Sequence, residues 1–371
     1  MDKASLKFLE HLCNSFGPSG FEREPLKLTK EYIRKYSDEI VHDKLGSLLF
    51  KKMGTFKSPI VLLPGHVDEV GFVISGINDK GYLTFNTVGG WFDQVLLGQR
   101  VRVRTKKNDI LGIIAAKPPH LLPPDERKKV VTKDKMFIDV GCSNKEEAEN
   151  LGIRIGDPVV PVSEFSQTQK VVFEEKKKKG KMPLAIGKAF DDRIGAFIAT
   201  EVVKRLSEEN IEHPNTVIGA ATTQEEVGLR GARTTAHVAE PDVCITLEVD
   251  IAGDVPGIEP HEAPAKMGKG PSMLTYDSTM IPNQPLKEFI IDIAERNNIP
   301  LQLSHVRGGT DAGVIHIHGA GCPSVVIGIP TRHIHSHVGI LSLEDVENGV
   351  QLVIEVIKKL DQKTVNKFTA I

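Results

Sequence analysis

"SPIVLLPGHVDEVGFVISGI", residues 58–77, joins two kinds of β structure in one short stretch. Its first half is nearly continuous in apolar residues, which is typical of a strand buried on both faces of a sheet. From Gly71 to about Ser163 the apolar segments become short and are separated by Gly, Asn, Asp and Pro. Such spacing favours a small β-barrel or sandwich. The sequence therefore predicts that a β domain begins directly after a buried strand of another domain.

Helices and strands alternate on both sides of this insertion. Apolar periodicity predicts helices over residues 4–16, 25–37, 193–209, 284–298 and 343–362, and strands over residues 47–53, 58–67, 215–223, 242–250 and 324–329. This alternation is typical of an α/β domain with a mixed sheet flanked by helices. We therefore expect one discontinuous domain of residues 1–70 and 164–371, split by an inserted small β-barrel-like domain of residues 71–163.

The composition is that of a globular chain without a strongly charged surface. Of 371 residues, 40% are hydrophobic and 26% are charged, with a formal net charge of -2. Neither nucleic acid nor a membrane is therefore an expected partner. The N-terminal segment contains no long apolar run, so we expect no signal peptide or membrane anchor and a cytoplasmic location. The cysteines lie far apart and are expected to be reduced thiols, namely Cys13, Cys142, Cys244 and Cys322.

Polar side chains gather where the predicted strands end. His66 and Asp68 lie two positions apart at the end of a buried strand, so they can share a face. A carboxylate is the usual partner of a metal-bound histidine. Asp191 and Asp192 precede a helix, where one could cap free N–H groups while the other reaches a metal. Taken alone, each pair is explained as well by a solvated turn or by helix capping.

Glu225 and Glu226, in "TTQEEVGLRGA" (residues 222–232), form the most demanding pair. Two ionised carboxylates in a cleft repel each other unless a cation lies between them or one holds a proton. With a divalent metal present, one glutamate could ligate the ion while its neighbour takes a proton from the metal-bound water. On its own the pair is also typical of a solvated loop.

Two further strands add candidate ligands. Glu248 lies inside an apolar strand, where a lone charge is costly, and Asp250 and Asp254 follow it. "PTRHIHSHVGI" (residues 330–340) has alternating histidines that we expect on one face of an extended segment, namely His333, His335 and His337. Together, these clusters offer the nitrogen and oxygen ligands that suit a pair of zinc, cobalt or manganese ions.

Nine motifs between about residues 5 and 360 carry a resemblance to a known family. In order they read "GHVDEVGF", "GGWFDQVLLGQRV", "KPPHLL", "FIDVGCSNKEEAENLGIRIGDPV", "KAFDDRIG", "TTQEEVGLRGA", "AGDVPG", "GGTDAG" and "RHIHS". The series resembles the glutamyl aminopeptidase and deblocking aminopeptidase family of dinuclear metallopeptidases, whose members include the tetrahedral aminopeptidases.

The resemblance implies a role for each matching position. The implied metal ligands are His66, Asp191 as the bridge between two ions, Glu226, Glu248 and His335. The implied catalytic residues are Glu225 as general base and Asp68, which steadies His66, and the implied substrate-binding residues are Gly309, Thr310 and Asp311. Glu248 stands where many relatives have an aspartate, so Asp250 is the alternative ligand. His337 departs from the family pattern and receives no role.

The resemblance also implies an activity and an assembly. The activity is that of an aminopeptidase in which two divalent ions, zinc or cobalt before manganese, activate the water that attacks the first peptide bond. The inserted domain would form dimers, and the dimers would build a hollow dodecamer around peptide substrates. Two other classes stay open, namely another two-metal hydrolase (a deacylase, carboxypeptidase or glycan hydrolase) and a non-catalytic metal- or peptide-binding scaffold.

Overall fold

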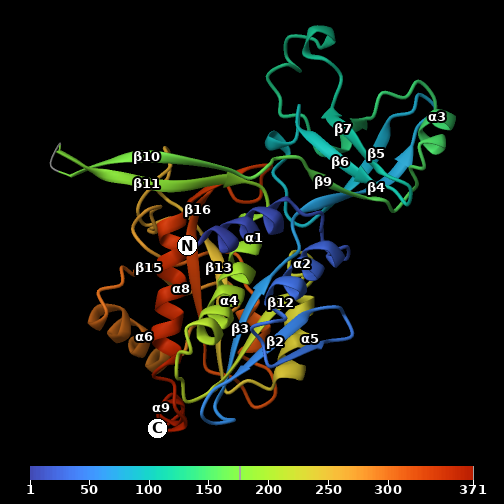
Figure 1. The fold of residues 1–371 in the computed structure, drawn as a ribbon. Helices are drawn as coiled ribbons and strands as arrows, with labels where there is room; N and C mark the ends of the chain where they lie inside the picture. The colour runs from blue at the N-terminus through green and yellow to red at the C-terminus, as the bar shows by residue number, and fades with distance from the viewer. Residues whose placement is uncertain (175–176, 371) are drawn as a thin grey trace.

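The computed structural model describes residues 1–174 and 177–370. Figure 1 shows a large mixed β-sheet flanked by helices and, beyond one end of it, a closed antiparallel β-barrel. The long antiparallel pair of β10 (Ser166–Glu174) and β11 (Lys177–Gly187) projects away from the body of the molecule (Figure 1). This architecture confirms the predicted α/β fold class with an inserted barrel.

Eleven strands of the described chain form the sheet. Besides β10 and β11 they are β1 (Glu39–His42), β2 (Leu48–Met53), β3 (Ile60–His66), β12 (Thr216–Thr222), β13 (Val243–Ile251), β14 (Ser272–Leu274), β15 (Gln302–Ser304), β16 (Ser324–Arg332) and β17 (Gly339–Ser342). The order is β1-β2-β12-β3-β13-β16-β17-β11-β10, with β14 and β15 beside β16. The four central strands from β12 to β16 run parallel, and the strands before and after them in this order pair antiparallel. Beside them, β14 pairs antiparallel with β16 and parallel with β15. The carboxyl ends of the parallel strands therefore meet at one edge of the sheet.

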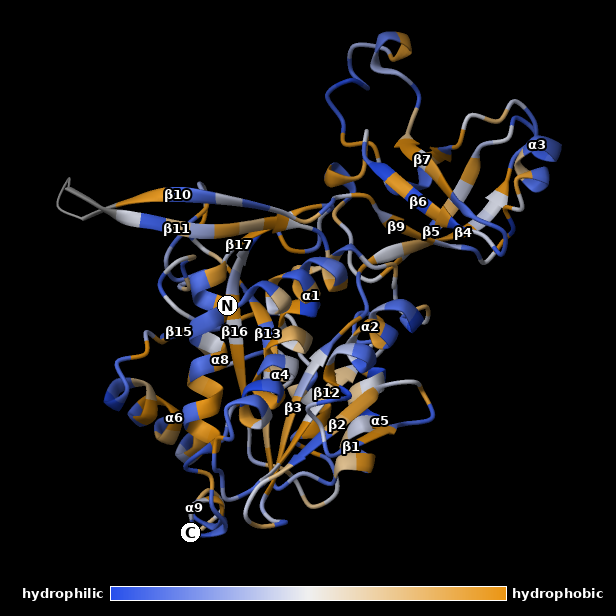
Figure 2. Ribbon diagram, in the orientation of Figure 1, coloured by the Kyte–Doolittle hydropathy of each residue, from blue (hydrophilic) through white to orange (hydrophobic). Residues whose placement is uncertain are grey.

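Helices cover both faces of the sheet. The described helices of this part are α1 (Lys3–Asn14), α2 (Arg23–Ile33), α4 (Phe190–Glu208), α5 (Arg230–Ala239), α6 (Gln284–Arg296), α7 (Ala312–Ile315), α8 (Leu343–Ile357) and α9 (Gln362–Asn366). Along β3, Val61 and Leu63 join the core under α4 and α8, whereas Leu62 joins the core under α5 and α7. Figure 2 accordingly shows the central strands as predominantly hydrophobic. The last predicted helix is shorter than expected, because α8 ends at Ile357 and α9 is separate.

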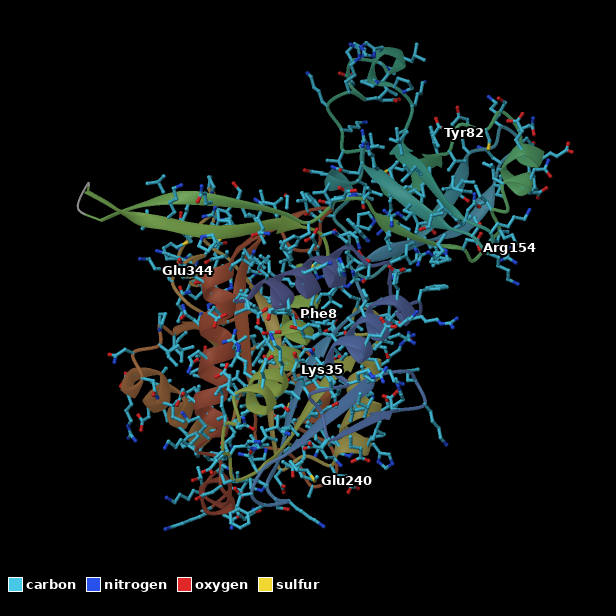
Figure 3. The ribbon with its side chains drawn as sticks, in the orientation of Figure 1. Phe8, Lys35, Tyr82, Arg154, Glu240 and Glu344 are labelled. Carbon is cyan, nitrogen blue, oxygen red and sulfur yellow. The ribbon has the colours of Figure 1, made fainter. Side chains whose placement is uncertain are left out.

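The N-terminal helices pack onto α4 and the end of β3. Phe8, labelled in Figure 3, stacks on Tyr32 with ring centroids 4.1 Å apart. Arg193 of α4 is fully buried and donates hydrogen bonds to Val67, to Glu69, and to the backbone carbonyls that end α1, namely those of Leu12, Cys13 and Ser15. One guanidinium therefore joins α1, α4 and the segment that follows β3.

Arg193→Met is expected to lower the free energy of unfolding by about 3–5 kcal/mol, since the buried Glu69 carboxylate loses one of its partners. Urea unfolding monitored by circular dichroism measures this change. Arg296→Met, at a side chain that is 77% exposed, is the matched control and should shift the value by less than about 0.5 kcal/mol. Equal losses in both variants would contradict the assigned role of Arg193.

The barrel has its own core. Its strands pair in the order β4-β5-β8-β7-β6-β9, and their bounds are Gly71–Ile77 (β4), Leu83–Val88 (β5), Arg100–Arg104 (β6), Asp109–Ala115 (β7), Phe137–Asp139 (β8) and Pro158–Pro161 (β9). Short helices lie between them, namely η1 (Asp93–Val95), η2 (Pro119–Leu121), η3 (Lys133–Lys135) and α3 (Lys145–Asn150). Phe72 and Trp91 stack at 4.8 Å within this core, which is separate from the cores of the sheet. The barrel's first strand begins at Gly71, directly after the loop that follows β3.

Candidate functional site

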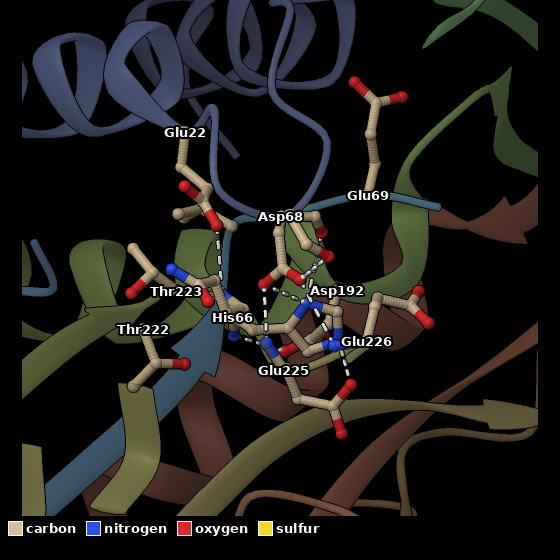
Figure 4. Close-up of polar contacts among 12 residues, drawn as sticks. Glu22, His66, Asp68, Glu69, Asp192, Thr222, Thr223, Glu225 and Glu226 are labelled. Carbon is tan, nitrogen blue, oxygen red and sulfur yellow. Dashed lines mark hydrogen bonds and ion pairs between the residues drawn. The ribbon is translucent and has the colours of Figure 1, made fainter. Parts of the chain in front are cut away.

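The candidate site lies at the carboxyl ends of the parallel strands. His66 ends β3, Glu248 lies near the end of β13, and the loops after β12 and β16 carry Glu225 and His335. Open α/β sheets bind their ligands at this edge. The topology thus brings together residues that are up to 269 positions apart (335 minus 66). Figure 4 shows part of this cluster.

Two histidines, His66 and His335, point their Nε2 atoms toward Asp191. His66 Nδ1 lies 3.1 Å from the backbone carbonyl of Asp68, and His335 Nδ1 lies 2.7 Å from that of Gly90. Because a carbonyl only accepts hydrogen bonds, each Nδ1 carries the hydrogen, and each Nε2 keeps a free lone pair when its ring is neutral. These Nε2 atoms lie 3.2 Å and 3.3 Å from different oxygens of Asp191. The Asp191 carboxylate therefore lies between two imidazole nitrogens.

The neighbouring acid has a different task. Asp192 Oδ1 accepts the backbone N–H of Gly195 at 2.9 Å, and its Oδ2 accepts that of His66 at 3.1 Å. Asp192 has non-helical φ and ψ angles inside α4, so the first contact caps the regular part of the helix that follows it. Asp192 thus holds two backbone N–H groups and lies near His66 and Glu248, while Asp191 faces both histidines.

Asp68 holds the glutamate loop as well as His66. Its Oδ1 accepts the backbone N–H of Glu225 at 3.0 Å, and its Oδ2 accepts that of Glu226 at 3.2 Å, as the dashed lines of Figure 4 show. Asp68 Oδ1 also lies 3.4 Å from His66 Nδ1. Glu225 Oε2 then reaches to 3.6 Å from His66 Nε2, and Glu226 Oε2 to 3.8 Å from His335 Nε2.

The electrostatics of the cluster call for added positive charge. Burial, followed by the Asp191 charge, raises the pKa of Glu226 to about 8. Burial lowers the pKa of His66, yet the carboxylates around it raise that pKa well above its usual value. Hydrogen bonding to Asp191 raises the pKa of His335 to about 10. Protons or a divalent cation can supply the missing charge.

The donor set fits a metal. Glu226 Oε1 is buried without a hydrogen-bond partner among the described residues, which is costly unless a cation neutralises it. Two groups of side chains have ligand atoms within 4.8 Å of one another, namely His66 with Asp191 and Glu226, and His66 with Asp192 and Glu248. Imidazole and carboxylate ligands suit zinc, cobalt and manganese.

Glu248 and Asp250 diverge in the structure. Glu248 lines a cavity of about 360 Å³ together with His66, Asp191, Glu225 and His335. Asp250 instead accepts a hydrogen bond from Ser272 Oγ at 2.6 Å and does not line this cavity. The geometry therefore favours Glu248 over Asp250 as a ligand.

The predicted substrate stretch is divided in the same way. Gly309 and Thr310 line the cavity. Asp311 is buried behind it, where its Oδ2 accepts a hydrogen bond from Thr222 Oγ1 at 2.6 Å. Burial raises the pKa of Asp311 to about 6.

The prediction that the three alternating histidines share a face of an extended segment is wrong. His333 and His335 have φ angles of +63° and +51°, so the chain turns sharply between β16 and β17. His335 faces Asp191, while His337 is buried against Trp91 at a ring distance of 5.2 Å. Desolvation lowers the pKa of His337 to about 4, which gives it the character of a neutral core residue.

Sequence reasoning missed two residues that hold the site from the N-terminal side. Ser19 Oγ donates to Asp68 Oδ2 at 2.7 Å. Glu22 Oε1 accepts the backbone N–H groups of Gly20 and Gln224 at 2.7 Å and 3.0 Å. Gln224 adopts a left-handed φ of +54°, so this bond fixes a strained residue directly before Glu225. The Pro- and Gly-rich turn "GPSGFE" was the sequence feature that could have indicated Ser19 and Glu22.

Glu22→Ala is expected to lower kcat about 10- to 100-fold with little change in KM, because the turn that presents Glu225 loses its anchor. Glu22→Gln should keep most of the activity, since its amide oxygen can still accept the N–H of Gln224. Steady-state peptide hydrolysis measures both, with Glu31→Ala, at an exposed residue of α2, as control. A Gln variant as slow as the Ala variant would contradict a role through the acceptor oxygen.

Comparisons with known proteins agree over nearly the whole chain. The family model of M42 glutamyl aminopeptidases matches residues 46–352. The "Putative aminopeptidase FrvX" of Escherichia coli strain K12 is 36% identical over 367 residues, 98% of each chain. A TET aminopeptidase crystal structure from the archaeon Thaumarchaeota archaeon SCGC AB-539-E09 is 60% identical, with a TM-score of 0.92 over 99% of both chains. The TET1 peptidase of Pyrococcus horikoshii, which can assemble into a tetrahedron or a large octahedral shell, is 30% identical, with a TM-score of 0.82 over 96% of this chain and 100% of that one.

Fold and site define an α/β protein with a histidine and carboxylate cluster able to hold metal. The chain belongs to the M42 glutamyl aminopeptidase family, and its activity class is therefore that of the aminopeptidases, hydrolases that act on peptide bonds.

Proposed function

We propose that the protein is a dinuclear metalloaminopeptidase that removes N-terminal amino acids from peptides. The observation that carries this proposal is the Asp191 carboxylate, whose two oxygens face the Nε2 atoms of two different histidines. A carboxylate in this position can bridge two cations, each held by one histidine. The family match supports the reaction class.

The proposed ligands divide into two sets around Asp191. His335 and Glu226 would hold one divalent cation, and His66 and Glu248 would hold the other. When bound, the cations would polarise the scissile carbonyl and lower the pKa of the attacking water. Zinc and cobalt are proposed before manganese.

Glu225 is the proposed general base. Its carboxylate lies beside His66 in the cavity, and Asp68 fixes its backbone. Glu225 would take the proton of the attacking water and then deliver it to the leaving amine. Burial and the neighbouring acids raise its pKa well above the usual value, so the carboxylate is a stronger base than an exposed glutamate, although the charge of His66 opposes the shift. Asp68 acts through His66 and the backbone of Glu225 and is a positioning residue.

The acidic cavity also accounts for action at a free N-terminus. Carboxylates at its polar end would attract a protonated α-amine, whereas an acetylated terminus has no charge to offer. Release of amino acids from free but not N-acetylated peptides, with metal-stripped protein before and after adding zinc, cobalt or manganese, tests the proposal. No release with any of the three metals would contradict it.

We further propose that residues 71–163 form a dimerisation domain and that dimers build a dodecamer that encloses the sites. The assembly of the related Pyrococcus horikoshii peptidase supports this proposal. Within the described residues, every helix is too short or too polar to cross a bilayer. The cytoplasmic location stays a prediction.

A further inference from the structure

The cavity beside Asp191 has two chemically different parts. Its polar end carries the histidines and carboxylates of the proposed metal site. The rest of its lining is aliphatic apart from the Gly308–Thr310 turn, and its members come from two strands and two loops: Val249, Ile251, Leu274, Val306 and Ile334. Because the cavity holds about 360 Å³, it has room for a side chain beyond the reacting atoms.

The aliphatic part offers no charge to a substrate. Among the described residues that line the whole cavity, none is a lysine or an arginine, and all of the acids belong to the proposed metal site at the polar end. Arg332, at the end of β16, is paired with Asp254 through two nitrogens. Asp250 lies behind the wall and is held by Ser272. Arg307 is exposed and does not line the cavity.

We propose that this aliphatic wall binds the side chain of the substrate's N-terminal residue and selects an uncharged aliphatic side chain, such as leucine, over glutamate or lysine. The inference rests on the proposed aminopeptidase function and departs from the acidic preference in the family's name.

The selection follows from desolvation. A charged side chain entering the wall would lose its water without meeting an opposite charge, which is costly. An aliphatic side chain instead gains from burial, and one methylene in such a pocket is worth about 10- to 200-fold in kcat/KM. Leucine at the N-terminus should therefore exceed alanine, glutamate and lysine by at least about 10-fold in kcat/KM.

The first test compares tripeptides of the form X-Ala-Ala, with leucine, alanine, glutamate or lysine at X, using the metal-loaded wild-type protein. The expected result is the highest kcat/KM for leucine. Equal or faster release of glutamate or lysine would overturn this inference and leave the proposed aminopeptidase intact. No release from any peptide would overturn the proposed function, and this inference with it.

The second test places a charge in the wall. Ile251 is 40% exposed at the carboxyl end of β13, so Ile251→Arg can keep its guanidinium hydrated at the cavity mouth. The ratio of kcat/KM for leucine over glutamate should fall at least about 10-fold, because the cation favours an acidic side chain. Ile317→Arg, at a 67% exposed isoleucine outside the cavity, is the matched control and should leave the ratio unchanged.

Thermal unfolding and bound-metal content establish that both arginine variants are folded and loaded. A folded, loaded Ile251→Arg variant with the wild-type leucine-to-glutamate ratio would overturn the assignment of the wall as the side-chain subsite. So would an equal fall of the ratio in Ile317→Arg.

Discussion

Glu225→Gln is expected to lower kcat about 100- to 10,000-fold while the protein still binds its metals. Glutamine has nearly the same shape as glutamate but cannot take a proton from water. The turn should keep its conformation, because Asp68 holds the backbone N–H of residue 225 rather than its side chain. The loss should therefore appear in kcat and leave the metal content unchanged.

Stopped assays of free amino acid release, paired with metal analysis of the same samples, measure this effect. Glu240→Gln is the control, since Glu240 caps the C-terminal end of α5 and does not line the cavity. Wild-type activity in Glu225→Gln would remove Glu225 as the base. Loss of metal together with activity would instead assign it to the ligand set.

Asp191→Asn is expected to abolish metal-dependent activity and to reduce the bound metal below the proposed two ions per chain. An amide presents one oxygen and one N–H₂ group, so it can no longer offer an anionic oxygen to each side of the cluster. Substituting a residue that only supports a metal ligand typically lowers activity by up to roughly 100-fold. The loss of activity in Asp191→Asn should be larger. The structural reason is that each Asp191 oxygen faces its own histidine.

Titration with zinc, followed by calorimetry and by activity, measures both quantities. Asp292→Asn, at an exposed site on α6, controls for the change of charge. Two ions per chain with unchanged affinity in Asp191→Asn would show that this carboxylate does not bridge. Calorimetry separates that outcome from a simple loss of activity.

The sequence predicted those parts of the fold whose signals are local. Strand β3 and the first barrel strand were found because a buried parallel strand and a short barrel strand differ in apolar pattern. The short strands β8 and β9 were not predicted, since three or four residues carry too little periodicity. Where α8 ends was also missed, because its apolar pattern continues past Ile357 to Leu360.

The sequence predicted the residue types of the site better than it predicted their arrangement in space. Which of Asp191 and Asp192 faces both histidines depends on backbone angles that no sequence pattern reports. The same holds for His333 and His335, whose left-handed φ angles break the expected alternation. Glu22 went unnoticed because its partner, the N–H of Gln224, lies 202 positions away.

The contact between His335 Nδ1 and the carbonyl of Gly90 limits how freely the barrel of this chain can be exchanged for that of a relative. Gly90 belongs to the barrel segment between β5 and β6, so the insertion supplies the acceptor that sets the tautomer of a histidine on the other part of the chain. A side chain at Gly90 would crowd that ring, since an added Cβ would lie 3.1 Å from Nδ1. The barrel is thus no detachable module. Swapping it between relatives requires the Gly90 carbonyl to be restored in place, because a chain without it would lose the acceptor that orients His335.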